Sequence, residues 1–144
     1  MTLTSNVAGG GVELRNSSRP ATVCLPYRPE SVAAARRCVQ AKLCEWGLDD
    51  LVDDALVIVS ELTSNAVRTG CQAHLLVAVR RPTGHFVRIL VGDGSCTMPV
   101  MINAGAEATS GRGLGIVHRL THGRWGATLF PLGKIVHADL MIAQ

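Results

Sequence analysis

The spacing of apolar residues changes along the chain, and this change constrains the fold more than any other feature. Between residues 32 and 66 apolar residues recur every three or four positions, which is typical of helices that bury one face. Over 73–92 and 125–142 they form short runs separated by turns that contain proline and glycine, which is typical of antiparallel strands. The order of these patterns predicts two helices followed by two strand hairpins.

The two helices are expected to follow one another directly. The first begins near 29–31 with Ser31 as its N-cap and ends at Gly47. The second begins at Asp49-Asp50, whose carboxylates suit the positive end of a helix dipole, and ends at Gly70. Their apolar stripes are Val32, Ala35, Val39, Leu43 and Trp46 in the first, and Leu51, Val52, Ala55, Leu56, Val59, Leu62 and Ala66 in the second.

Strands are expected on both sides of this helical pair. Residues 21–25 predict a short strand, and residues 73–80 and 85–92 predict a hairpin. Residues 125–130 and 134–142 predict a second hairpin. Each hairpin has a turn that contains proline and glycine, which are frequent turn residues for different conformational reasons.

The predicted elements define a fold class. Residues 96–110 show no periodicity and are expected to form a mobile loop, followed by a short helix over 113–121. Helices that segregate from a mixed, mostly antiparallel sheet predict an α+β fold, a two-layer sandwich with the helices on one face. Residues 1–20 are expected to be a flexible N-terminal segment, and residues 21–142 a single domain.

Composition excludes several classes of protein. The 144 residues are 47% hydrophobic, 3% aromatic and carry a net charge of +3, so neither disorder nor a nucleic-acid surface is expected. No run reaches about 18 apolar residues and no signal peptide is recognisable, so we expect neither a membrane span nor secretion. The five cysteines lack a CxxC pair, which favours reduced thiols in the cytoplasm, each a small buried side chain.

A polar stripe lies on the second helix, opposite its apolar stripe. Glu61 and Asn65 stand four positions apart and therefore share a face with Ser64 and Arg68. An amide oxygen is a hard ligand for Mg²⁺, and a carboxylate can take a proton from an attacking hydroxyl. Taken alone, the stripe is typical of a solvated helix face, and it can also serve a metal–phosphate site.

Two segments that contain glycine could contact a ligand. Asp93 stands between two glycines after a strand, where it could accept a hydrogen bond from an exocyclic amine such as that of adenine or form an ordinary turn. Residues 110–117 place glycine at every second position before a helical pattern, which would free backbone N–H groups to meet a phosphate. This spacing fits neither a P-loop nor GxGxxG.

In this order the three segments resemble the N, G1 and G2 boxes of the GHKL ATPase and kinase superfamily, which has the two-layer Bergerat ATP-binding fold. Residues 60–68 (SELTSNAVR, the N box) and 111–117 (GRGLGIV, the G2 box) are most similar to those of stand-alone anti-sigma-factor serine kinases. Trp125-Gly126 and Gly133-Lys134 are similar to that subgroup too. The resemblance covers residues 21–142 and implies one ATP-binding, kinase-like domain.

The resemblance implies a role for each position. Glu61 would be the general base, Asn65 the Mg²⁺ ligand and Asp93 the adenine contact, and Cys96–Ser110 would form the ATP lid. The glycines of the G2 box, with Arg112, would hold phosphates. The implied nucleotide-binding positions are Asn65, Asp93, Gly94, Gly111, Arg112, Gly113, Leu114 and Gly115.

The function implied is a cytoplasmic serine/threonine protein kinase of the anti-sigma-factor type that uses ATP and Mg²⁺. The implied partners are a sigma factor and an anti-anti-sigma protein of the STAS type, often with the kinase as a homodimer. The intact Glu61–Asn65 pair favours this function. Ser95 and Thr97 stand where the G1 box usually has glycine, which favours the alternative, a non-catalytic nucleotide-gated regulatory binding module.

Overall fold

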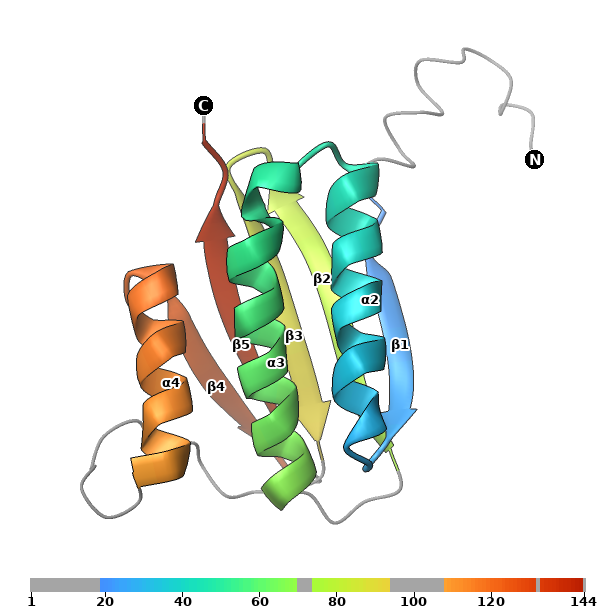
Figure 1. Ribbon diagram of the computed structural model, residues 1–144, viewed down its shortest axis with the longest axis vertical. Coiled ribbons are helices and arrows are strands. Elements are labelled where there is room, and N and C mark those ends of the chain that lie inside the picture. The colour runs from blue at the N-terminus through green and yellow to red at the C-terminus, as the bar shows by residue number, and fades with distance from the viewer. Residues whose placement is uncertain (1–18, 70–73, 94–107, 132, 144) are drawn as a thin grey trace.

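The chain folds into two layers, a sheet and the helices that cover one of its faces (Figure 1). The computed structural model describes residues 19–69, 74–93, 108–131 and 133–143. Most of the N-terminal segment expected to be flexible and most of the predicted lid therefore lie outside the described residues. The predicted two-layer α+β fold is confirmed within the described ranges.

The sheet is antiparallel throughout its described strands, which are ordered β1-β2-β3-β5-β4. Both predicted hairpins are present, β2 with β3 and β4 with β5, and the pairing of β3 with β5 joins them. The elements are β1 Ala21–Pro26, α2 Glu30–Glu45, the 3₁₀ turn η2 Asp49–Leu51, α3 Val52–Thr69, β2 His74–Thr83, β3 Phe86–Asp93, α4 Ala108–Thr121, β4 Trp125–Phe130 and β5 Gly133–Met141.

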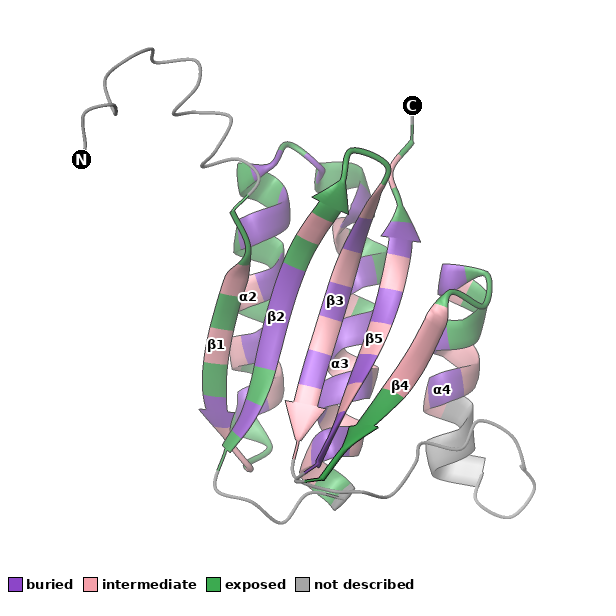
Figure 2. Cartoon of the chain, turned by 180° about the vertical axis from the view of Figure 1, so that it is seen from behind, coloured by how far each residue is buried: buried purple, intermediate pink, exposed green. Residues whose placement is uncertain are grey.

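Alternation along the strands separates a buried face of the sheet from an open one. On β2, Leu75 and Val77 are buried in the core beneath the helices, whereas Leu76 between them is 43% exposed. Figure 2 shows the open face from behind, with exposed and half-buried positions between buried ones. This pattern is the period of two that side chains follow along a strand. The buried side chains of the strands face the helices and form the core with them.

Most members of the apolar stripes of both predicted helices are in the core, because they recur with the helical period, whereas Val32 and Leu56 are only half-buried. Ala35, Val39 and Leu43 of α2 and Ala55 and Val59 of α3 are completely buried. Gly47 follows α2 with φ of 72°, a left-handed conformation that glycine adopts without a steric penalty. The predicted end of the first helix is therefore confirmed.

The predicted N-cap of the first helix is wrong. Pro29 is at the N-cap, and Ser31 lies inside α2. The Ser31 hydroxyl donates instead to the carbonyl of Pro26, at 2.5 Å, and its side chain is buried. Ser31 thus ties the start of α2 to the end of β1, a contact between elements that a local capping pattern does not reveal.

The third helix is longer than its apolar pattern predicts. α4 begins at Ala108, whereas the pattern predicts a start at Gly113. The prediction of a loop is therefore wrong for residues 108–110, while the rest of the predicted loop, 96–107, lies outside the described residues. Backbone hydrogen bonds build a helix whether or not it has an apolar face, so an apolar period does not mark where the backbone of α4 begins.

The expectation of buried cysteines is wrong at two of the described positions. Cys24 and Cys44 are exposed, and Cys38 is half-buried. Cys24 is on the open face of β1, because the alternation that buries Leu25 turns its neighbour outward. Burial raises the pKa of the Cys38 thiol above its ordinary value, and the positive charge of Lys42 partly opposes this shift.

The structure contains no helix, within its described residues, long and apolar enough to cross a membrane.

Candidate functional site

The predicted site residues gather at one end of the molecule. The C-terminal ends of α3 and β3, the N-terminal part of α4 and the start of β5 all lie at the lower end of Figure 1. Segments that are far apart in the sequence therefore meet there. The helices are on the buried side of the sheet, so this end brings both layers together.

Glu61 and Gly113 are in direct contact across the α3–α4 interface. An added Cβ at Gly113 would overlap the Oε1 atom of Glu61, so the carboxylate occupies the space that any larger residue would need. Both residues are half-buried. The structure thus brings the carboxylate of the N box against a glycine of the G2 box.

Asn65 lies one turn further along α3 on the same half-buried face. Its Oδ1 atom accepts a hydrogen bond from Arg68 Nη2 at 3.3 Å. Ser64 is also half-buried, while Leu62 and Ala66 face the core. The predicted division of this helix into an apolar and a polar face is confirmed.

Ser60, next to the carboxylate, joins two helices. Its hydroxyl donates to the carbonyl of Leu56 at 2.6 Å and accepts from Arg36 Nη1, also at 2.6 Å. Arg36 belongs to α2, so this contact connects α2 with the N box. This contact helps to position α3, which carries Glu61.

Two of the three G2 glycines lie beyond the first turn of α4. Gly111 is its fourth residue and Arg112 its fifth, and Gly113 and Gly115 follow as its sixth and eighth. Free N–H groups are confined to the first four positions of a helix, which in α4 precede Gly113. Neither Gly113 nor Gly115 therefore supplies one of these free N–H groups.

Close approach differs between these two glycines. Gly113 is against Glu61, whereas an added Cβ at Gly115 would meet no heavy atom within 4 Å. Leu114 between them is 3% exposed and belongs to the core, so only its backbone could contact a ligand. Gly94, another predicted binding position, lies outside the described residues.

Asp93 is held by Lys134, which the sequence analysis names in the resemblance but does not assign to the site. Lys134 Nζ is 3.1 Å from both carboxylate oxygens of Asp93. The Lys134 side chain is 0% exposed and that of Asp93 is 1% exposed. The burial of Lys134 could have been predicted from the sequence, because Lys134 shares the strand alternation of the buried residues Val136 and Ala138.

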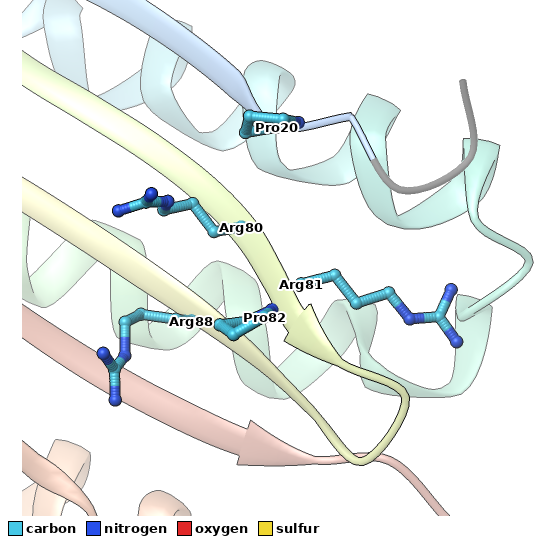
Figure 3. Close-up of a pocket in the computed structure, with 5 residues that line it drawn as sticks. All are labelled: Pro20, Arg80, Arg81, Pro82 and Arg88. Atoms are coloured by element: carbon cyan, nitrogen blue, oxygen red, sulfur yellow. The ribbon is translucent and has the colours of Figure 1, made fainter. Parts of the chain in front are cut away.

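Two cavities lie away from these residues. One of 360 Å³ is lined by Pro20, Arg80, Arg81, Pro82 and Arg88 (Figure 3). Figure 3 shows Arg80 and Arg81 pointing in opposite directions, and the Arg81 guanidinium lies 5.8 Å from the centre of the Trp46 ring. Arg88 is near the start of β3, whereas Asp93 ends it, so this cavity is at the other end of the strand.

The second cavity, of 280 Å³, is on the open face of the sheet. Its lining combines small and apolar side chains, with one arginine at its edge: Pro20, Thr22, Leu76, Ala78, Arg80, Leu90, Gly92 and Ile135. These residues alternate with the ones that face the helices. The cavity is therefore separated from Glu61 and Asn65 by the sheet itself.

The fold and this arrangement define a class of protein. An antiparallel sheet with helices on one face, a carboxylate and an amide on the central helix, and a glycine-rich helix beside them form a two-layer ATPase-type domain. A family model described as histidine kinase-like ATPase domain matches residues 25–123, more than half of the chain, and the chain belongs to this family. Among curated proteins, none matches the chain.

Family membership supports ATP binding and ATPase- or kinase-like chemistry in general. The matched range includes Glu61, Asn65, Asp93 and the glycines of α4. It ends before β5, so Lys134 lies outside the match.

Proposed function

We propose that this protein is a serine/threonine protein kinase of the anti-sigma-factor type that transfers the γ-phosphoryl group of ATP to a small partner protein. The observation that carries the proposal is the contact between Glu61 and Gly113. It places an acidic side chain directly beside the glycine-rich helix. A kinase needs a proton acceptor where the phosphates lie, whereas a protein that only binds nucleotide does not.

In this proposal each polar group has one task. Glu61 accepts the proton of the substrate serine hydroxyl as its oxygen forms a bond to the γ-phosphorus. The bond from that phosphorus to the bridging oxygen breaks, and ADP leaves with the electron pair. Asp93 accepts a hydrogen bond from the amino group of adenine, and Gly111, Gly113, Gly115 and Arg112 border the phosphates.

Asn65 would hold Mg²⁺ through its amide oxygen. Mg²⁺ takes few protein oxygens and completes its shell with water and phosphate, so one amide oxygen on a half-buried face fits this ion. The metal would neutralise charge on the phosphates when bound. The side chain of Arg68, which donates to Asn65 Oδ1, would then turn toward solvent, where it is exposed already.

The proposed partners are a sigma factor and a STAS-type anti-anti-sigma protein, with the kinase as a homodimer. The similarity of the N and G2 boxes to those of anti-sigma kinases supports this part of the proposal. The second candidate is a nucleotide-gated binding module without transfer, favoured by Ser95 and Thr97 at the glycine positions of the G1 box. The two candidates differ in whether the γ-phosphoryl group moves.

The test separates the two polar side chains of α3. Glu61→Gln removes the proton acceptor but keeps the shape, so it should leave ATP affinity within a few-fold and lower transfer by up to about 10²–10⁴-fold. Asn65→Ala should instead weaken ATP binding only when Mg²⁺ is present. Calorimetric titration gives the affinities. ATP labelled at the γ-phosphate reports both the transfer of label to a STAS-type protein and its release as free phosphate.

The matched control is Asp54→Asn, the same type of change at an exposed position of α3. It should leave both transfer and affinity unchanged. Labelled ATP that stays intact with every candidate partner would favour the binding module. Loss of ATP binding in Glu61→Gln would contradict the assignment of Glu61 as a base.

A further inference from the structure

The ion pair between Asp93 and Lys134 is a feature that the proposed catalytic steps do not use. Lys134 contacts both carboxylate oxygens at 3.1 Å, and both side chains are almost completely buried. The two residues are direct partners in the β3–β5 register. Their contact is therefore set by strand pairing, which holds both backbones in place.

Stability alone is a weak explanation for such a pair. Withdrawing two charges from water costs about as much as their attraction returns, and apolar replacements of buried pairs are often neutral or stabilising. Removing one partner is different, since it leaves an uncompensated buried charge. Burial disfavours the charged form of a carboxylate, so a neighbouring cation favours the ionised form.

Whether Asp93 is ionised decides what it can bind. An ionised carboxylate only accepts hydrogen bonds, whereas the protonated acid also donates one. The amino group at position 6 of adenine is a donor and fits the ionised form. The carbonyl at position 6 of hypoxanthine or guanine is an acceptor, so it is repelled by the ionised form and accepted by the protonated one.

Lys134 contacts each oxygen of the Asp93 carboxylate once. The two oxygens together have about four acceptor positions, and one ammonium group placed between them engages one on each. Lys134 also fixes the plane of the carboxylate, because it is equidistant from both oxygens. The oxygen that faces a base is therefore held in one orientation.

We propose that Lys134 is a positioning residue that keeps Asp93 ionised and oriented, so that the base site selects a 6-amino purine over a 6-oxo purine. This inference rests on the proposed function, since it concerns the same nucleotide site. It adds a residue of β5 that lies outside the range matched by the family model.

The experiment compares ATP with inosine triphosphate, whose base has a carbonyl at position 6. Both are titrated into the full chain with Mg²⁺, and the ratio of the two dissociation constants is the readout. The wild-type chain should prefer ATP by about 10- to 100-fold, the range of a hydrogen bond to a charged group. Lys134→Met should reduce this preference to within a few-fold, and Lys134→Arg, which keeps the charge, should restore much of it.

The matched control is Lys42→Met. Lys42 is likewise a buried lysine in an ion pair, 3.1 Å from Glu45, but it belongs to α2. Its loss should leave the preference for ATP unchanged. A merely structural Lys134 would weaken both nucleotides equally and leave the ratio as in the wild-type chain.

A second variant keeps the test decisive where Lys134→Met does not fold. The double variant Asp93→Asn with Lys134→Met removes both charges together, and its amide can both accept and donate. It should fold and bind both nucleotides with similar affinity. The inference would be overturned if Lys134→Met or the double variant kept the wild-type preference for ATP. It would also be overturned if the wild-type chain bound both nucleotides equally, and in both cases ATP binding itself would stand. A wild-type chain that binds neither nucleotide would overturn the proposed function and the inference with it.

Discussion

Gly113 is required by its neighbour rather than by its own backbone conformation. The space beside it is taken by the carboxylate of Glu61. At Gly115, two residues further along α4, the corresponding space contains no heavy atom within 4 Å. An added methyl group would therefore overlap another side chain at Gly113 but not at Gly115.

Gly113→Ala should displace the Glu61 side chain and lower phosphoryl transfer by up to about 10²-fold, because small misplacements of a reacting group carry costs of that size. ATP affinity should change much less than the transfer rate. Single-turnover transfer with saturating ATP measures the effect. An unchanged transfer rate would show that Glu61 can move without losing its role.

Gly115→Ala isolates the effect of helix propensity on stability. Alanine in a helix interior is more favourable than glycine by about 0.5–1 kcal/mol, and no atom opposes the added methyl group. We expect an increase of that size in the free energy of unfolding, measured in urea. Gly113→Ala should gain less, because the displaced carboxylate offsets part of the benefit.

At the residue scale the sequence predicts where a side chain lies when its place follows from the period of its own helix or strand. Glu61 and Asn65 are found on one half-buried face because a four-residue spacing places them there. Lys134 could not be paired with Asp93 from the sequence alone. Their contact depends on the β3–β5 register, which joins residues 41 positions apart.

Elements bounded by local turn chemistry are well predicted. β4 and the hairpins fall within a few residues of their expected bounds, because proline and glycine mark the turns. The start of α4 is missed since Ala108 and its neighbours lack an apolar period. Ser31 is misassigned because its hydroxyl bonds to the preceding strand, at Pro26, rather than to its own helix.

β5 carries a group of charges on the open face of the sheet. Arg88 of β3 donates to Asp139 through two hydrogen bonds of 2.7 and 2.9 Å, and this pairing raises the pKa of the guanidinium. His137 lies on the same face of β5. Partial burial lowers the pKa of His137, the charge of Arg88 lowers it further, and Asp139 opposes both effects.

This shift predicts a loss of stability on acidification. The unfolded chain takes up a proton on His137 near its ordinary pKa of about 6.5, whereas the folded chain does so only at lower pH. The contribution of His137 is therefore complete above about pH 6.5 and declines as the pH falls through 6.5 toward the lower folded pKa.

Urea unfolding at pH 7.5, 6.5 and 5.5 measures this contribution. His137→Asn should show a smaller decline in midpoint over this interval than the wild-type chain. The same substitution at His74, which is exposed on β2, is the matched control. Equal declines in the wild-type chain and His137→Asn would contradict the assignment.

At the scale of the whole molecule, the core lies between the two layers, and the outer face of the sheet is left open. The helices and the inner face of the sheet share a single cluster of buried residues, whereas the outer face has a 280 Å³ cavity bordered by Leu76 and Leu90. The proposed nucleotide site is at the end of the two layers, where α3, α4, β3 and β5 meet (Figure 1). Binding there connects both layers.

ATP should therefore stabilise the complete domain. A ligand that binds only the native state at a hundredfold excess over its dissociation constant adds about 2.7 kcal/mol, which for a chain of this size raises the melting temperature by roughly 5–10 °C. Thermal melts with Mg²⁺ alone, and with Mg²⁺ and ATP, measure the shift. Identical melting curves at millimolar ATP would contradict nucleotide binding.

The pairing of β3 with β5 also sets an order of events in time. The hairpins β2–β3 and β4–β5 close over short turns and can form early, on the scale of microseconds. Asp93 and Lys134 meet only when strands 41 residues apart in the chain come together, and α4 must pack on α3 to bring Gly113 to Glu61. An interaction completed after the folding barrier slows unfolding and leaves the folding rate unchanged. ATP is therefore expected to lengthen the lifetime of the native chain without hastening its formation.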